Sequence, residues 1–306
     1  MSCRDVPLIN SNSAKSPAAW RMLYLSLFLL PLAYLALLFS VAIHEVLGHG
    51  MAACRVGGFF HGFRIGWDGG GLAWAFAPKD ARPSAEIFVL ANGVLAQSEV
   101  GILCLLVAMW FRKRRLFLFM TLLLFAFFCL TGASSYIFWS LYPSQVAAGP
   151  SASTADLARI LHLTGNPWLR TVLMPASGVL FVVFTALGMA LFFEGIERFV
   201  AGQRLHGVTR AVALMLFVVI PGVGGWFLFD WDTVIPGIGR LPCVTGAAVH
   251  LFAGALLYRW SLRPCAGQPE LETVIGPTAA AWTLILGMVL ALGGCLNHGL
   301  YWGPRW

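Results

Sequence analysis

Two histidines and a glutamate stand close together in an otherwise apolar part of the chain. They are His44, Glu45 and His49, within the letters HEVLGH. The run before them, residues 22–43, holds no charged residue, and ionisable groups beside such a run are costly to bury and usually functional. Imidazole nitrogens bind zinc, and a carboxylate next to a zinc ligand can act as a general base. The pattern therefore predicts a zinc site with a general base beside it.

The five-residue spacing of the two histidines requires a distorted helix. In an α-helix four residues turn through about 400°, which brings two side chains onto one face, whereas five residues turn through about 500°. A π-type turn is one residue wider and removes this mismatch, and Gly48 lowers the local preference for α-helix. We predict a π-bulge at Val46–Gly48. The alternative is that His44 lies at the membrane face and that His49 is a loop histidine.

The composition is that of a membrane protein. Of the 306 residues, 59% are hydrophobic and 11% are charged, whereas about a quarter of a soluble domain is charged. The net charge of +7 is spread over loops, which indicates a lipid bilayer and no nucleic acid as a partner. The 7 cysteines form no CxxC pair, which argues against a disulfide framework and a thiolate zinc site.

We predict an all-α polytopic membrane protein with about seven transmembrane helices and a short membrane-associated β-hairpin. The hairpin is expected at 58–77, with its turn at 68–71, because glycines and alternating apolar residues gather there. The chain divides into a polar tail (1–19), a core (20–165) and a C-terminal four-helix membrane region (166–306). The expected spans are Trp20–Ile43, continuing as helix to about Cys54, Ala85–Trp110, Leu116–Trp139, Val172–Phe193, Val208–Phe229, Val244–Trp260 and Thr278–Leu296.

Basic residues predict the orientation in the membrane. The strongest cluster, residues 112–115 (RKRR), stands between the second and third spans. The positive-inside rule places this cluster and the N-terminus in the cytoplasm. The histidine motif, the hairpin and the polar segment 142–170 are then expected together at the outer face.

The letters AIHEVLGHGMAA resemble the first active-site helix of the site-2 protease family of intramembrane zinc metalloproteases, whose pattern is H-E-x-x-H. The resemblance implies that His44 and His49 are zinc ligands and that Glu45 is the catalytic base. The longer spacing is similar to the H-E-x-x-G-H motif of dipeptidyl peptidase III, a soluble family that binds zinc through both histidines. That second likeness covers six residues and implies nothing about the fold.

The same family implies further site residues. Residues 91–97 (ANGVLAQ) are similar to its small-Gly-Pro-x-x-Asn segment, which implies that Asn92 and Gln97 bind the backbone of a substrate strand. The alternative is that these two amides join helices. Residues 154–161 (TADLARIL) are similar to the family's Asp-Gly element at a helix start, which implies Asp156 as the third ligand.

Other interpretations of these polar residues stay open. Asp156 could simply stabilise the start of a helix expected from Thr154 to His162, capped by Ser153 or Thr154. The rival third ligands are His61, Asp68 and Glu86. Glu99 could pair with Arg112 or with a hydroxyl of a neighbouring span, and His250 and His298 are expected to form hydrogen bonds between helices.

Together these inferences predict a zinc-dependent intramembrane endopeptidase that hydrolyses a peptide bond of a membrane protein. Zn²⁺ would lower the pKa of a water molecule, and Glu45 would carry its proton to the leaving amine. The hairpin would offer an edge for the extended substrate strand. The alternatives are a transporter or scaffold with a vestigial metal site, and a zinc hydrolase that acts on a lipid or a small amide.

Overall fold

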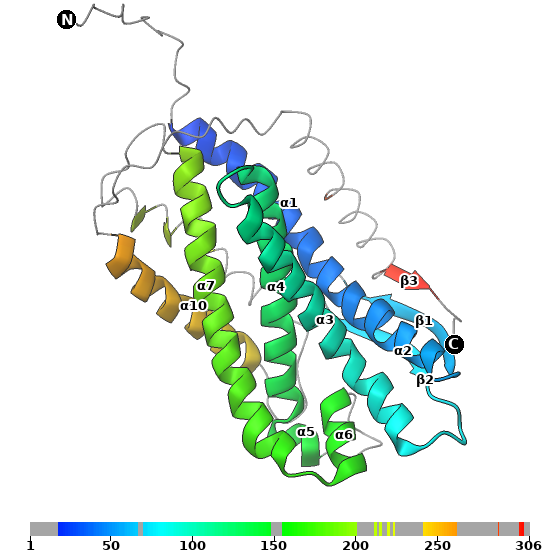
Figure 1. The fold of residues 1–306 in the computed structure, drawn as a ribbon. Helices are drawn as coiled ribbons and strands as arrows, with labels where there is room; N and C mark the ends of the chain where they lie inside the picture. Colours follow the sequence, from blue (N-terminus) through cyan, green and yellow to red (C-terminus); the bar gives the residue numbers. More distant parts are fainter. Residues whose placement is uncertain are drawn as a thin grey trace, which may run out of the picture.

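The computed structural model describes residues 18–66, 70–147, 155–200, 241–261 and 300–302, with the single positions 211, 212, 214, 215, 219, 220, 223 and 287. Within them, 4 helices are long and apolar enough to cross a membrane (Figure 1): Pro31–Arg55, Pro83–Phe111, Leu116–Ser140 and Leu169–Arg198. A further helix, α10 (Leu241–Ser261), is apolar over a shorter stretch. Four predicted spans are thus confirmed, while those at 208–229 and 278–296 lie almost wholly outside the described residues.

The histidine motif lies within one long helix. This helix is built from α1 (Ala18–Ala42), the π-helix η1 (Ile43–Gly50) and α2 (Met51–Arg55), so the predicted continuation to about Cys54 is confirmed. Its apolar stretch runs over Pro31–Arg55. The predicted boundary at Ile43 implied that the motif lies at the end of the span. The motif instead lies inside the candidate span.

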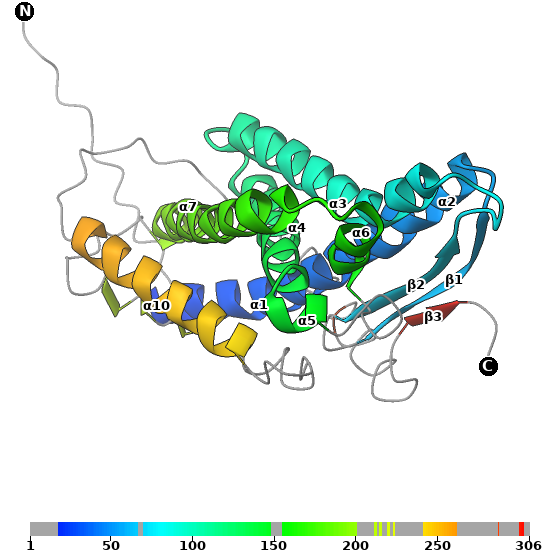
Figure 2. The ribbon, with the colours of Figure 1, turned by 90° about the horizontal axis from the view of Figure 1, so that it is seen from below.

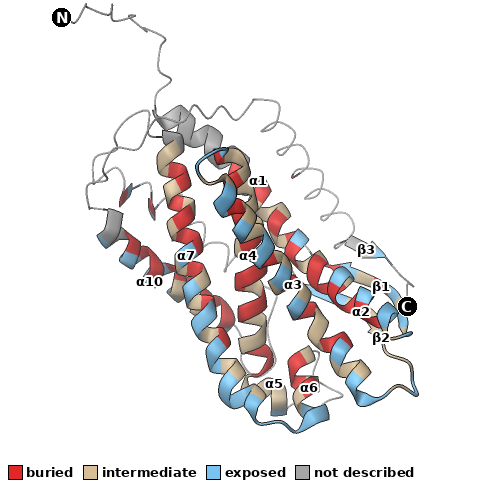
Figure 3. Ribbon diagram, in the orientation of Figure 1, coloured by how far each residue is buried: buried red, intermediate tan, exposed pale blue. Residues whose placement is uncertain are grey.

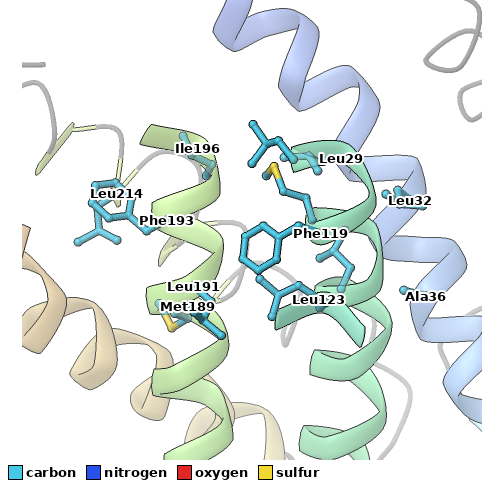
Figure 4. Close-up of a cluster of buried hydrophobic side chains, with 14 of the residues drawn as sticks. Leu29, Leu32, Ala36, Phe119, Leu123, Met189, Leu191, Phe193, Ile196 and Leu214 are labelled. Atoms are coloured by element: carbon cyan, nitrogen blue, oxygen red, sulfur yellow. The ribbon is translucent and has the colours of Figure 1, made fainter. Parts of the chain in front are cut away.

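Helix α4 (Leu116–Ser140) is the centre of the bundle. It packs against α1, α3 (Pro83–Phe111) and α7 (Met174–Val200). The π-turn η2 (Leu169–Leu173) directly precedes α7. Of the four candidate spans, α4 has the largest buried share of its apolar stretch. Figure 4 shows the resulting core, which includes Leu29 and Leu32 of α1, Phe119 and Leu123 of α4, and Met189 and Ile196 of α7. The predicted division at residue 165 stays a prediction.

The predicted hairpin is confirmed as β1 (Phe59–Ile65) and β2 (Gly71–Phe76), paired antiparallel. Part of its turn, residues 67–69, lies outside the described residues. A bulge in β1 leaves His61 without a partner residue on β2. A third strand, β3 (Leu300–Trp302), pairs with the other edge of β1 and gives the order β2-β1-β3, as Figure 2 shows. No local pattern predicted β3, because its pairing depends on a strand far away in the chain.

Two short helices follow α4: α5 (Pro143–Ala147) and α6 (Asp156–Thr164). The N-cap of α6 is Ala155, which offers no side-chain cap, so the predicted start at Thr154 is wrong; Ser153 and Thr154 themselves lie outside the described residues. Helix α6 ends at Gly165, whose φ of +59° is the left-handed conformation common after helices. In Figure 1 the sheet and α6 lie at one end of the bundle, and the turn at 112–115 lies at the other.

Candidate metal centre

Three side chains from two distant parts of the chain meet at one point. They are His44 and His49 of η1 and Asp156, the first residue of α6, and their ligand atoms lie within 4.8 Å of one another. Asp156 Oδ2 is 3.6 Å from His44 Nε2 and 3.1 Å from His49 Nε2. Two ligands that each lie about 2.1 Å from one tetrahedral zinc ion are about 3.4 Å apart. The group therefore could hold a metal ion, and its two nitrogens and one carboxylate are donors that suit zinc.

The π-helix η1 is what turns both imidazoles to the same side. The backbone N–H of Met51 bonds the carbonyl of Val46, five residues earlier, so residues five apart come to lie over one another. The rings of His44 and His49 lie 4.9 Å apart between centroids, at 75°. The predicted π-bulge is confirmed, and it spans the whole motif from Ile43 to Gly50.

Hydrogen bonds leave the Nε2 atoms of both imidazoles free to bind a metal ion. His49 Nδ1 donates to the carbonyl oxygen of Val89 over 2.8 Å. His44 Nδ1 lies 3.1 Å from Oε1 of Gln97, whose Nε2 donates to Ser40 Oγ over 2.7 Å. Because both Nδ1 atoms carry the proton, both Nε2 lone pairs face Asp156.

Tyr136 of α4 holds the third member of the group. Its hydroxyl donates to Asp156 Oδ2 over 2.8 Å and accepts from the backbone N–H of Asp156 over 3.1 Å. The second bond supplies the cap that Ala155 lacks. The ring of Tyr136 also packs edge-on against His44, 5.0 Å away. The sequence analysis missed this residue, although the polar letters SSY at 134–136 in an apolar span are a signal.

The Asp156 carboxylate is largely buried, with 14% of its side chain exposed. Burial alone would raise its pKa. When His44 and His49 are protonated, their hydrogen bonds and charges outweigh that effect and hold the pKa of Asp156 below its usual value. Asp156 is therefore ionised, as a metal-binding carboxylate has to be.

Glu45 is buried beside this group and has no hydrogen-bond or ion-pair partner within the described part of the chain. Its carboxylate lies against Gly71, the first residue of β2: a Cβ at Gly71 would overlap Glu45 Oε1 and lie 2.8 Å from Glu45 Cγ. Helix and hairpin thus meet at the predicted base. A buried carboxylate without a partner remains available to accept a proton.

Two glycines let the backbone of α3 approach the imidazoles. A Cβ added to Gly93 would lie 2.5 Å from His49 Nε2 and 2.8 Å from His44 Nε2. A Cβ added to Gly48 would overlap the Cα atom of Gly93 and lie 2.9 Å from the carbonyl oxygen of Asn92. Gly48 therefore permits close packing as well as the wide turn, and Gly93 forms one wall of the site.

The predicted substrate contacts lie next to the histidines but make bonds within the protein. Asn92 Nδ2 donates to the carbonyl oxygen of Gly48 over 2.8 Å, and Gln97 is bonded to His44 and Ser40. These bonds suit residues that join η1 to α3 and orient His44. Their contact with a substrate strand stays a prediction.

Of the rival third ligands, His61 and Glu86 do not join the group. His61 stacks on Phe59, with ring centroids 5.9 Å apart, and Glu86 pairs with Arg159 of α6 over 2.8 Å. Asp68 lies outside the described residues.

The remaining polar residues have other positions. The predicted pairing of Glu99 with Arg112 is wrong, because Arg112 bonds Glu194 of α7 over 2.5 Å. His250 donates to the carbonyl oxygen of Gly246 over 3.0 Å, one turn earlier in its own helix. His298 lies outside the described residues.

The comparisons with known proteins agree with this geometry for part of the chain. The family model described as Peptidase M50B-like matches residues 18–148, and Asp156 lies beyond its end. No curated protein and no solved structure matches the chain. The likeness of the motif to dipeptidyl peptidase III is not confirmed by the match. The matched residues 18–148 hold the histidine motif, the hairpin and the helices that carry Gln97 and Tyr136, so this part of the chain is similar to the Peptidase M50B-like family.

Proposed function

We propose that the protein is a zinc-dependent intramembrane endopeptidase that hydrolyses a peptide bond of a membrane protein. The observation that supports this most is the meeting of His44, His49 and Asp156 beside a buried, unpaired Glu45. The match of residues 18–148 to a peptidase family supports the reaction class, and the four apolar helices support a reaction in or at the bilayer.

The roles of the residues follow from their positions. His44, His49 and Asp156 would hold the zinc ion through two Nε2 atoms and a carboxylate oxygen. Bound zinc supplies Lewis acidity, which makes a water molecule acidic and polarises a carbonyl group. Glu45 would accept a proton from the attacking water molecule and later pass it to the leaving amine. Gln97 and Val89 keep the imidazoles in the protonation state that binding needs, and Tyr136 orients the carboxylate.

The sheet supports a path for an extended substrate. Strand β1 pairs with β2 along one edge and with β3 along the other. Strand β2 packs against η1, and its second edge has no partner strand in the described part of the chain. A substrate strand added to β2 would run past Glu45, which lies at Gly71. Asn92 and Gln97 of α3 are the proposed contacts to its backbone.

Stoichiometric zinc in the purified protein is the first expected result. The His44→Ala variant should lose this zinc, because two remaining ligands cannot hold the ion tightly. The control is His61→Ala, which removes a histidine of β1 outside the group and should leave the zinc content unchanged. Elemental analysis of the three proteins checks this. A wild-type protein without zinc, or equal zinc in the His44→Ala variant, would contradict the proposed function.

Tyr136→Phe is expected to weaken zinc binding by about 10- to 100-fold, the usual effect of removing a bond to a metal ligand. The ring is retained, so the loss reports the two bonds to Asp156. Competition with a chromogenic chelator measures the affinity. Tyr142→Phe, a change just beyond the end of α4, is the matched control. If the Tyr136→Phe effect is just as large in an Asp156→Ala background, Tyr136 does not act through Asp156.

A further inference from the structure

Helix α3 turns a continuous outer seam away from the bundle. Its inner face is buried and carries Gly93 and Gln97 of the metal centre. Its outer face is exposed, and α3 is the least buried of the four candidate spans; Figure 3 shows these exposed positions along the helix. The outer seam consists of Phe88, Leu95, Glu99, Ile102, Leu106 and Met109.

The apolar members of the outer seam do not by themselves indicate a partner, because any helix packed on one side shows a lipid-facing stripe with this spacing. Glu99 is what distinguishes the seam. It is exposed, and within the described residues it has no hydrogen bond and no ion pair. The nearest cation along the helix, Arg112, is bonded to Glu194.

Glu99 stands near the middle of the candidate span formed by α3. It stands 16 residues after Pro83 and 12 before Phe111, which is about 24 Å and about 18 Å along the helix axis. The hydrocarbon core is about 30 Å thick, so this position is near its middle. A polar group that faces lipid there is strongly disfavoured, and such residues normally face protein or a water-filled cavity.

We infer that the outer seam of α3 is the interface of a homodimer in which Glu99 meets Glu99 of a second copy. A two-fold axis along the membrane normal places the same residue of both copies at the same depth. Two carboxyl groups that share protons can hydrogen-bond to each other, so a second copy satisfies Glu99 without any other donor. The alternating spacing of four and three residues along Leu95, Glu99, Ile102, Leu106 and Met109 is that of two helices packed at a shallow crossing angle.

Counting subunits tests the interface. In phosphatidylcholine vesicles at low protein density, stepwise photobleaching of the labelled wild type should show two subunits per particle. Glu99→Leu should raise the dimer dissociation constant about 5- to 30-fold, the equivalent of the 1–2 kcal/mol measured for one interhelical hydrogen bond. Glu99→Gln keeps a donor and an acceptor and should stay dimeric. An unchanged thermal unfolding midpoint shows that both variants are folded.

Disulfide formation gives a second measurement. A cysteine that replaces Ile102, on the outer seam, should cross-link two copies. A cysteine that replaces Val183 of α7 should not. Val183 is the matched control, because the native side chains of Ile102 and Val183 are 50% and 49% exposed. A monomeric wild type, equal dimerisation of Glu99→Leu, or equal cross-linking at both positions would overturn the inference. A different membrane protein that binds the wild type but not Glu99→Leu would also overturn it.

Discussion

Glu45→Gln is expected to slow peptide hydrolysis by about two to four orders of magnitude, the range that a positioned general base contributes. The amide has the shape of the carboxylate, so its packing against Gly71 is retained. It cannot take a proton from water at neutral pH. Glu45 is not one of the three metal-binding side chains, so zinc should stay bound.

The measurement has two parts: turnover of a transmembrane substrate that the wild type cleaves, and the zinc content of the same sample. Glu99→Gln is the control, because it makes the same chemical change on the face of α3 that points away from the metal centre. This variant should cleave at the wild-type rate. A Glu45→Gln enzyme with full activity would rule out Glu45 as the base. Loss of zinc in this variant would indicate that Glu45 helps to hold the metal.

Gly93→Ala is expected to weaken zinc binding by about 100-fold or more, at the upper end of what outer-shell changes do. The added methyl group would lie 2.5 Å from His49 Nε2 and 2.8 Å from His44 Nε2. One or both rings must move, although Val89 and Gln97 of the same helix already fix their Nδ1 atoms. Alanine favours a helix over glycine by about 1 kcal/mol, so the helix itself has no reason to unfold.

Zinc affinity and thermal unfolding, measured together, separate these two effects. Gly195→Ala is the matched control in α7. Its new methyl group meets the flexible side chain of Met120, so this variant should keep the wild-type zinc affinity. Wild-type zinc affinity in Gly93→Ala would show that the imidazoles have room to shift, and that this wall does not shape the site.

The sequence by itself determined the parts of the protein that depend on neighbouring residues. The apolar runs predicted four spans that the structure confirms, because burial of a helix in lipid depends on its own composition. The spacing of His44 and His49 predicted the π-turn, because the hydrogen bonds of a helix join residues no more than five apart. The glycines and alternating apolar residues predicted the hairpin for the same reason.

The tertiary structure decided what holds the site together. Asp156 comes from more than 100 residues beyond His49, and the packing of α6 against α3 and α4 brings it to the imidazoles. Tyr136 and Gln97 act from two other helices, and Gly93 is required only because η1 lies against α3. Such contacts depend on how separate helices pack, and the apolar patterns of α3 and α4 do not encode which faces meet. The sequence therefore predicted His44, His49 and Glu45 from a local motif and Asp156 only from a family resemblance, and the packing of the bundle is what brings Asp156 to the two imidazoles.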